Sequence, residues 1–218
     1  MSAPHILISG AGIGGLTAGL ALAQNGARVE IFERSTELLE IGAGLQLGPN
    51  AMHVLHPLGL SEAIEASAFE PESIAIRHYK SGKPLLSTPL KGAHRGRYGQ
   101  KYLHIHRADL QNILAEAAKD AGVTVHLGQE IRNYEQDKDG VSFDTQSQSI
   151  SGDILIGADG IKSAIRRQML GPENNTFTGN VAWRGLVPTK DLPPDLIPPC
   201  ANNWVGPERH FVSYYVRG

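Results

Sequence analysis

The chain has 218 residues, of which 41% are hydrophobic and 19% charged, a composition typical of globular proteins and not of disordered or fibrous ones. Its 20 Lys and Arg residues against 22 Asp and Glu residues give a formal charge of −2, so no net attraction to nucleic acid or to an anionic membrane is expected. A single cysteine, Cys200, excludes an internal disulfide and a cysteine-based zinc site. No apolar run approaches the roughly 20 residues that a membrane-spanning helix needs, and we expect no signal peptide, because the first apolar run is short and leads directly into Gly10. We expect a cytoplasmic protein.

The first 33 residues predict a strand, a tight turn, a helix and a second strand. The apolar run His5–Ser9 ends in a glycine cluster, and an Ala- and Leu-rich stretch over 13–25 stops before Gly26. Residues 27–33 then alternate apolar and polar side chains and end in an acid. This succession predicts one parallel βαβ unit.

The later segments predict a mixture of helices and strands, some of which extend a mostly parallel sheet and others of which form a smaller antiparallel one. A helix is expected after Pro49, and two further helices are expected over 107–121 and 161–170. Trp183 is expected in the core, and the prolines between 188 and 199 predict a surface segment. The expected strands cover residues 73–79, 84–88, 102–106, 123–127, 130–135, 141–144, 153–156 and 210–217.

The glycines after the first strand match the G-x-G-x-x-G pattern of dinucleotide-binding turns. Gly10 allows the tight bend, Gly12 admits a pyrophosphate, and Gly15 lets the helix approach the strand, with Ile13 and Gly14 between them. An ordinary tight turn can carry the same glycines. The preceding strand, the following helix and an acid at the end of the second strand favour dinucleotide binding, with the phosphates at the helix N-terminus.

Glu33 is the acid at the end of the second strand, where a carboxylate can accept hydrogen bonds from ribose hydroxyls. A carboxylate there would repel a 2′-phosphate, although the neighbouring Arg34, also a candidate cofactor residue, keeps NADP open. The candidates are therefore FAD or NAD, with NADP less favoured. A glycine-rich loop and antiparallel strands follow Glu33 in place of further parallel βα units, and this interruption favours FAD.

At this point the chain resembles the N-terminal part of the class A flavoprotein aromatic monooxygenases, which include the salicylate and 3-hydroxybenzoate hydroxylases. The resemblance runs along nearly all 218 residues. Four motifs in order carry it, which is more specific than any one alone. They are residues 10–15 with Glu33, 42–50, 106–110, and 157–163 with Arg166.

The resemblance implies that FAD is the cofactor, with NADH or NADPH as co-substrate. Residues 12–15 would face the pyrophosphate and Glu33 the adenosine ribose. Gln46 would lie near the ribityl chain or the flavin, and Arg107 would reach the flavin phosphate or ribityl region, which suits a guanidinium fork. Asp159 sits in a strand–turn–helix corner, where its carboxylate can cap the helix, reach ligand hydroxyls, or do both.

The family's reaction transfers one oxygen atom of O2 to an electron-rich ring, usually a phenol, so a small aromatic substrate is the expected partner. Such chemistry calls for a base near the substrate. His210 and Tyr214, which period 2 places on one face of the last expected strand, are the candidates. Ordinary sheet residues would look the same. The remaining histidines show no metal-ligand spacing, so no metal site is predicted.

The expected fold class is α/β, with a Rossmann-like FAD-binding domain that starts with βαβ and a smaller, incomplete antiparallel substrate sheet. Residues 1–72 and 100–172 would build the FAD-binding domain, and 73–99 and 173–218 the substrate segments. The family's later fingerprint, Gly-Asp followed by Ala, and its helical C-terminal region are absent from the sequence. We therefore expect an N-terminal portion, completed by a missing C-terminal half or by a second polypeptide, and of doubtful activity alone. A nucleotide-binding module, or an FAD-dependent reductase or halogenase on the same scaffold, remains the alternative.

Overall fold

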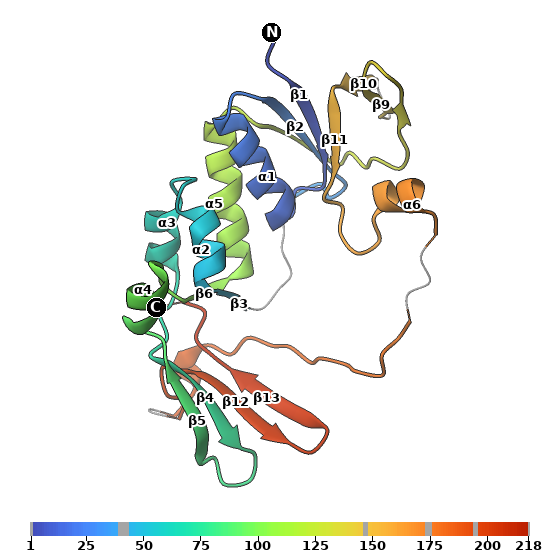
Figure 1. Ribbon diagram of the computed structural model, residues 1–218. Coiled ribbons are helices and arrows are strands. Elements are labelled where there is room, and N and C mark those ends of the chain that lie inside the picture. Colours follow the sequence, from blue (N-terminus) through green and yellow to red (C-terminus); the bar gives the residue numbers. More distant parts are fainter. Residues whose placement is uncertain (1, 39–43, 146–147, 173–175, 194–195, 218) are drawn as a thin grey trace. The chain divides into compact units, whose positions relative to one another are not determined.

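The computed structural model describes residues 2–38, 44–145, 148–172, 176–193 and 196–217 (Figure 1). The chain divides into two compact units, the first formed by residues 1–40 and 110–181 and the second by residues 41–109 and 182–218. Each unit is described separately below. Within the described ranges, no helix combines the length and the apolar character that crossing a bilayer requires.

The first unit is built on a four-stranded parallel sheet in the order β11-β1-β2-β7. Its strands are β1 (His5–Ser9), β2 (Arg28–Glu33), β7 (Thr124–Leu127) and β11 (Ile154–Gly157). Its helices are α1 (Ile13–Gln24), α6 (Ala164–Leu170) and the part of α5 (Arg107–Asp120) that follows Asp109. A small antiparallel sheet adds β8 (Glu135–Gln136), β9 (Val141–Asp144) and β10 (Ser149–Gly152).

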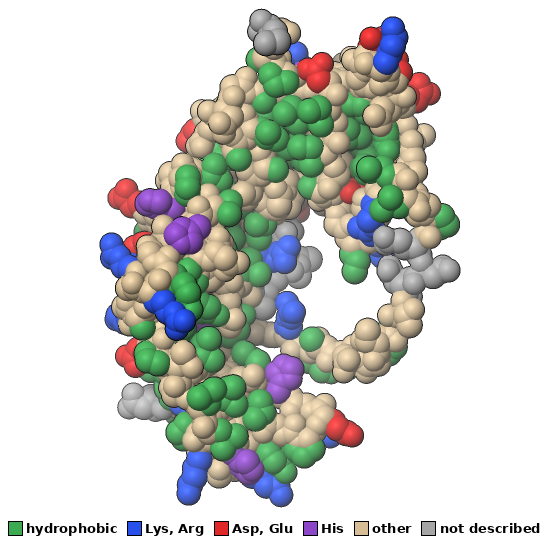
Figure 2. Space-filling model, viewed as in Figure 1, with side chains coloured by type: hydrophobic (Ala, Val, Ile, Leu, Met, Phe, Trp, Pro, Cys, Tyr) green, Lys and Arg blue, Asp and Glu red, His purple; other side chains and the backbone are tan. Residues whose placement is uncertain are grey.

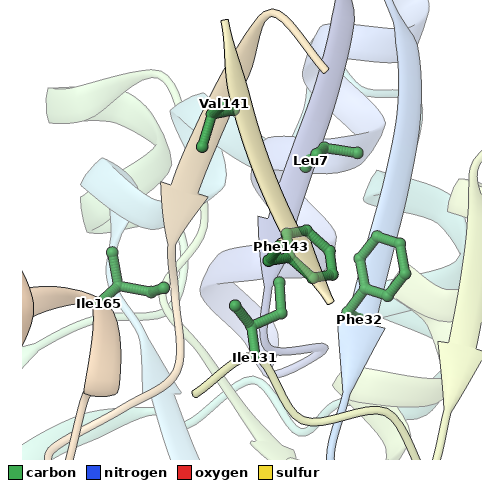
Figure 3. Packing of buried hydrophobic residues seen from close by; sticks show 6 residues of the cluster. All are labelled: Leu7, Phe32, Ile131, Val141, Phe143 and Ile165. Carbon is green, nitrogen blue, oxygen red and sulfur yellow. The ribbon is translucent and has the colours of Figure 1, made fainter. Parts of the chain in front are cut away.

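The apolar core of this unit is built around β1, one of the two inner strands of the sheet. Ile6, Leu7 and Ile8 are all buried, as expected for a parallel strand that is covered on both faces. Leu7 belongs to a cluster that joins the two sheets and α6, and Phe32 meets Phe143 edge to face in it. Figure 3 shows the cluster, whose members are Leu7, Phe32, Ile131, Val141, Phe143 and Ile165.

The second unit contains a two-stranded and a four-stranded sheet. β3 (Gly44–Leu47) pairs antiparallel with β6 (Leu103–His106). The larger sheet has the order β13-β12-β4-β5, with strands β4 (Ser73–His78), β5 (Pro84–Pro89), β12 (Ala201–Gly206) and β13 (Arg209–Ser213). Its helices are α2 (Pro49–Leu55), α3 (Ser61–Ser67), α4 (Ala93–Tyr98) and the 3-10 turn η1 (Thr189–Asp191).

The predicted fold class is confirmed: a βαβ start, a parallel sheet and a separate, mostly antiparallel sheet are all present. One pair in the second sheet, β12 with β4, is parallel. Four elements that the sequence pattern did not reveal are short strands or helices with little periodicity: β3, α3, α4 and β10. The sequence pattern did not reveal β12 either, because the prolines directly before it indicate a surface loop and not a strand.

Two predicted strands are wrong in extent. Of residues 130–135, only Glu135 lies in a strand, because the backbone N–H and carbonyl of Tyr134 bond the side chain of Gln168 and not a neighbouring strand. The strand predicted over 210–217 ends at Ser213, and the carbonyl of Tyr215 faces a histidine side chain.

A predicted helix and a predicted core residue also need correction. The helix expected over 161–170 begins only at Ala164, because the Ser163 hydroxyl accepts the Arg166 backbone N–H and caps the first turn. Trp183 was predicted to be in the core, but its side chain is 95% exposed in a segment without regular structure.

The boundaries of the two compact units differ from the boundaries of the predicted domains. Residues 41–72 and 100–109 group with the second unit by their contacts, although the sequence assigned them to a cofactor domain. Contact grouping does not test which residues serve the cofactor and which the substrate. The domain assignment therefore stays a prediction.

We expect the Leu7→Ala variant to lose about 2–5 kcal/mol of unfolding free energy, because it removes a fully buried side chain from the cluster in Figure 3. Ile154, on the adjacent strand β11, is 50% exposed and provides the matched control. Ile154→Ala should cost less than about 1 kcal/mol. Urea unfolding followed by circular dichroism measures both, and equal losses would contradict the assigned core.

Candidate cofactor site

The glycine turn after β1 is formed by close contacts between three chain segments. The Gly10 backbone N–H donates to the Phe32 carbonyl at 2.8 Å, and the Ala158 N–H donates to the Ser9 carbonyl at 2.8 Å. Gly10 has a φ of +101°, and a Cβ at this position would collide with the Ala158 carbonyl. Glycine is therefore required at the first position of the motif.

The other glycines of the motif divide into one that packs and two that face open space. A Cβ on Gly15 would overlap the Gly10 carbonyl, which is the close helix–strand approach that the motif predicts. Apart from the chain neighbours and the backbone of α1 itself, no atom of the described residues lies within 4 Å of the positions that a Cβ on Gly12 or Gly14 would occupy. Helix α1 begins at Ile13 without a side-chain cap, so the first-turn amides suit an anion.

Glu33 is fixed against this turn by two backbone amides. Its Oε2 accepts the Ala11 N–H at 2.8 Å, and its Oε1 accepts the Ser35 N–H at 2.9 Å. The residue is half-buried, and each carboxylate oxygen keeps a lone pair for a further donor. The neighbouring Arg34 is exposed. A carboxylate held beside open glycines suits a ribose diol next to a pyrophosphate.

Gln111 contacts the same turn, and the sequence analysis missed it. Its Nε2 donates to the Ala11 carbonyl at 3.1 Å, and the side chain is only 4% exposed. Its Oε1 is also buried and has no hydrogen-bond partner within the described ranges. The available signal was a polar residue on the buried face of α5, next to Leu110 and in line with Leu114.

Asp159 caps helix α6 with one oxygen and leaves the other for a ligand. Its Oδ2 accepts the N–H groups of Ala164 and Ile165 at 2.7 and 3.3 Å. Its Oδ1 is buried, and no hydrogen bond to it is found in the part of the chain that the structure describes. Of the two roles open to Asp159, the cap is therefore present, and the orphaned acceptor fits the second, a contact with a ligand hydroxyl.

Together these residues fit the nucleotide part of a dinucleotide cofactor. The first unit offers open space at Gly12 and Gly14, uncapped amides at the start of α1, and acceptors on Glu33 and Asp159. All lie at the carboxyl ends of β1, β2 and β11, the edge at which parallel α/β sheets bind ligands.

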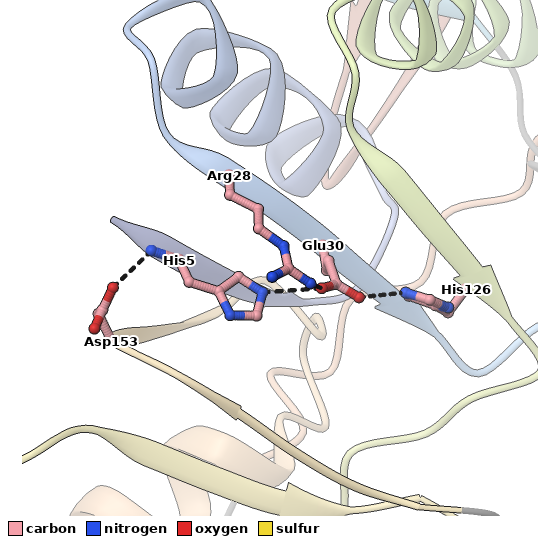
Figure 4. A network of polar contacts seen from close by, with 5 residues as sticks. All are labelled: His5, Arg28, Glu30, His126 and Asp153. Carbon is pink, nitrogen blue, oxygen red and sulfur yellow. Dashed lines mark hydrogen bonds and ion pairs between the residues drawn. The ribbon is translucent and has the colours of Figure 1, made fainter. Parts of the chain in front are cut away.

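A second polar cluster is centred on Glu30, in the middle of β2 of the same sheet (Figure 4). The Glu30 carboxylate pairs with His5 at 2.9 Å, with Arg28 at 2.7 Å and with His126 at 2.7 Å. Burial alone would raise the pKa of Glu30, but the hydrogen bonds from His126, Arg28 and His5 lower it below its ordinary value. Because His5 on β1 and His126 on β7 both bond Glu30 on the strand between them, the cluster links these three strands.

The second unit contains the remaining predicted cofactor residues. Gln46 lies on β3, is exposed, and its Oε1 accepts the Tyr102 hydroxyl at 2.8 Å. Arg107 is the first residue of α5 and is partly buried. Gly42 and Ala43, the first residues of the second motif, lie outside the described residues. No contact tests the cofactor roles of Gln46 and Arg107, which stay predictions.

Asp109, in the third motif, has a structural partner that the sequence did not reveal. Arg217 donates two hydrogen bonds to its carboxylate, at 2.7 and 2.8 Å. These bonds hold the pKa of Asp109 below its usual range, against the opposing effect of burial. The pair ties the chain after β13 to the first turn of α5.

The two predicted catalytic residues lie in different surroundings. His210 is exposed on β13, whereas Tyr214 follows the strand, so the argument that period 2 places both on one face does not apply. The Tyr214 hydroxyl donates to the Gly44 carbonyl at 2.8 Å. Burial raises the pKa of Tyr214, so its hydroxyl is protonated at neutral pH. Their catalytic roles stay predictions.

His104 is a fully buried histidine beside Tyr214. Its exposed fraction is 0%, and its Nδ1 lies 3.1 Å from the Tyr215 carbonyl, which can only accept, so Nδ1 carries a proton. Burial lowers the pKa of His104 to about 4, so the ring is neutral at physiological pH.

The depressed pKa of His104 predicts a loss of stability in mild acid. As the pH falls from about 6.5 to about 4, the unfolded chain protonates this imidazole before the folded chain does. Up to about 3 kcal/mol of unfolding free energy should therefore be present above pH 6.5 and lost toward pH 4. A His104→Asn variant, which cannot titrate, should lose less over this window in urea unfolding. An equal loss in both proteins would contradict a neutral buried imidazole.

Comparison with known proteins agrees with this geometry. Residues 4–204 match the family described as FAD binding domain. The chain is 37% identical over 216 residues to 3-hydroxybenzoate 6-hydroxylase 1 of Aquipseudomonas alcaligenes, which covers 98% of this chain and 55% of that protein. It is 39% identical over 215 residues to 3-hydroxybenzoate 6-hydroxylase of Polaromonas naphthalenivorans (strain CJ2), covering 98% and 54%.

Solved structures show the same fold. The crystal structure of CtdE in complex with FAD and a substrate superposes with a TM-score of 0.69 at 25% identity, covering 78% of this chain and 40% of that one. The chain spans about half the length of the curated relatives it matches. The family match covers most of the chain and includes every residue of the glycine turn, Glu33 and Asp159. The chain therefore belongs to the FAD binding domain family.

Proposed function

We propose that this chain is the FAD-binding portion of a flavoprotein monooxygenase that uses NADH or NADPH and O2 to hydroxylate a small phenolic or aromatic-acid substrate. The observation that carries the proposal is the Glu33 carboxylate, held by the Ala11 amide beside the open positions of Gly12 and Gly14. The names of the similar proteins, hydroxylases of 3-hydroxybenzoate, support the substrate class.

In the first unit, each proposed contact follows from the local chemistry. The uncapped amides at the start of α1 receive the pyrophosphate, and the missing Cβ atoms of Gly12 and Gly14 leave space for it. Glu33 accepts the ribose hydroxyls, and the orphaned Oδ1 of Asp159 accepts another ligand hydroxyl. When bound, FAD supplies the electron transfer from NAD(P)H and the oxygen chemistry.

For the second unit, we propose that Arg107 binds the phosphate or ribityl region of FAD and that Gln46 contacts the ribityl chain or the flavin. The basis is their match to the family motifs, together with the planar guanidinium fork of Arg107. Gln46 is already oriented, because its Oε1 accepts the Tyr102 hydroxyl and its amide N–H groups remain to donate.

We also propose distinct roles for the two catalytic candidates. Tyr214 is a neutral hydroxyl whose proton is directed at the Gly44 carbonyl, so its oxygen can accept the phenolic O–H of the substrate and orient it. A neutral phenol is a poor base at pH 7. For reaction, the phenolic O–H turns from Tyr214 to His210, which is exposed, and the imidazole takes the proton and leaves the substrate as the phenolate.

The cofactor proposal predicts that Glu33→Lys weakens FAD binding by about 10- to 100-fold, since it removes charge-assisted hydrogen bonds to the ribose. Glu37→Lys is the matched control, because Glu37 is exposed nearby and makes the same change in charge. Flavin fluorescence titration gives both dissociation constants. Arg107→Ala tests the second unit in the same assay. Unchanged affinity in Glu33→Lys would overturn the ribose contact.

The reaction is tested by mixing the FAD-loaded protein with NADH or NADPH, O2 and 3-hydroxybenzoate. Hydroxylation predicts that the aromatic acid stimulates NAD(P)H oxidation and that a product heavier by one oxygen atom forms, detected by mass spectrometry. Bound flavin without this stimulation, also in a longer protein that includes this chain, would instead favour the nucleotide-binding module, and stimulation without the oxygenated product would favour a reductase.

A further inference from the structure

We infer that His104 and Gly44 are positioning residues that hold Tyr214 in one orientation between β6 and β3. We call His104 and Gly44 the Tyr214 seat. The catalytic meaning of the seat rests on the proposed function, in which Tyr214 orients the substrate. The seat itself is defined by contacts among residues of the second unit, independently of any cofactor or substrate.

His104 forms the first wall of the seat. Its ring centroid lies 4.7 Å from that of Tyr214, and its Nδ1–H donates to the Tyr215 carbonyl at 3.1 Å. The first contact fixes the phenol ring, and the second fixes the next backbone unit. Since Tyr214 and Tyr215 lie beyond the last strand, no ladder hydrogen bond of a strand orients them.

Gly44 forms the second wall. Its carbonyl accepts the Tyr214 hydroxyl at 2.8 Å. A Cβ on Gly44 would approach Tyr214 Cε2 to 2.6 Å and would collide with Val216. Gly44, one of the glycines of the second motif, is therefore needed because the phenol ring occupies the space of its missing side chain.

The first wall is itself rigid. The backbone N–H and carbonyl of His104 exchange hydrogen bonds of 2.8 Å with Phe69, and His104 also pairs with Gln46 across the β3–β6 ladder. Phe69 packs against Tyr215, with ring centroids 5.1 Å apart. The imidazole Nε2 is buried without a hydrogen-bond partner within the described ranges, so the ring cannot accept a second proton cheaply. A neutral, immobile ring is suited to positioning and not to proton transfer.

Fluorine NMR of protein labelled with 3-fluorotyrosine measures the environment of Tyr214 through its chemical shift and needs no catalytic activity. The chain has six tyrosines, and Tyr214→Phe identifies the resonance of Tyr214. In His104→Leu, which keeps the volume but removes the donor and the aromatic contact, that resonance should move toward the position of free 3-fluorotyrosine. The resonances of Tyr79 and Tyr134, which do not contact His104, should stay in place and show that the fold is intact.

His104→Asn is the rescue variant, because its side-chain amide can donate from close to the position of Nδ1. It should keep the Tyr214 resonance nearer to the wild-type position than His104→Leu does. A folded His104→Leu protein with an unchanged Tyr214 resonance would overturn the inference. If His104→Leu does not fold, Gly44→Ala tests the seat from β3, and an unchanged Tyr214 resonance in that folded variant would overturn it equally.

The seat also predicts a kinetic signature in the FAD-bound protein. Misplacing an orienting hydroxyl by about 1 Å can cost about 100-fold in rate, so His104→Leu should lower kcat by up to that factor, with a smaller change in FAD affinity. Fluorine NMR tests the orientation of Tyr214, and the kinetics test the proposed function, so either claim can be refuted without the other. A shifted Tyr214 resonance without hydroxylation in the wild type would refute the proposed function and leave the seat standing.

Discussion

The convergence of three backbone segments at the end of β1 is the constraint on which the first unit depends. Gly10 donates to Phe32, Ala158 donates to Ser9, and a side chain on Gly10 would collide with the Ala158 backbone. The same convergence brings the Glu33 carboxylate to the Ala11 amide and carries Asp159 to the edge of the sheet. Packing and ligand geometry therefore have a common origin, because the contacts that close the sheet also assemble the acceptors around the glycine turn.

The first unit could be predicted from sequence because its signals are local and agree with one another. An apolar run, a glycine turn, a helix and an alternating strand follow in order, so the βαβ unit and the placement of Glu33 were evident. Gln111 and the Glu30 cluster were not, because each is defined by partners far away in the chain. The strand wrongly predicted over 130–135 has the same cause, since the side chain of Gln168, 34 residues away, bonds the Tyr134 backbone in place of a neighbouring strand.

The second unit was harder to predict because its elements are short and its decisive contacts cross long separations. Tyr214 bonds a carbonyl 170 residues earlier, and Arg217 bonds a carboxylate 108 residues earlier. Periodicity predicted one long strand through these residues, whereas side-chain contacts end it at Ser213. The structure explains two motif residues that the family resemblance alone does not explain. Gly44 leaves room for the ring of Tyr214, and Asp109 accepts hydrogen bonds from Arg217.

The space-filling view shows hydrophobic side chains at the surface of the second unit (Figure 2). Leu85 and Leu86, on the edge strand β5, are 62% and 56% exposed. An exposed edge strand of this kind is a template for intermolecular strand addition and aggregation. β5, however, begins at Pro84 and ends at Pro89, and neither residue has an N–H to offer a new strand. The two prolines thus limit pairing with another strand to the few residues between them. Replacing them would lengthen the edge that another chain can pair with and would favour aggregation, without changing any residue of the cofactor site.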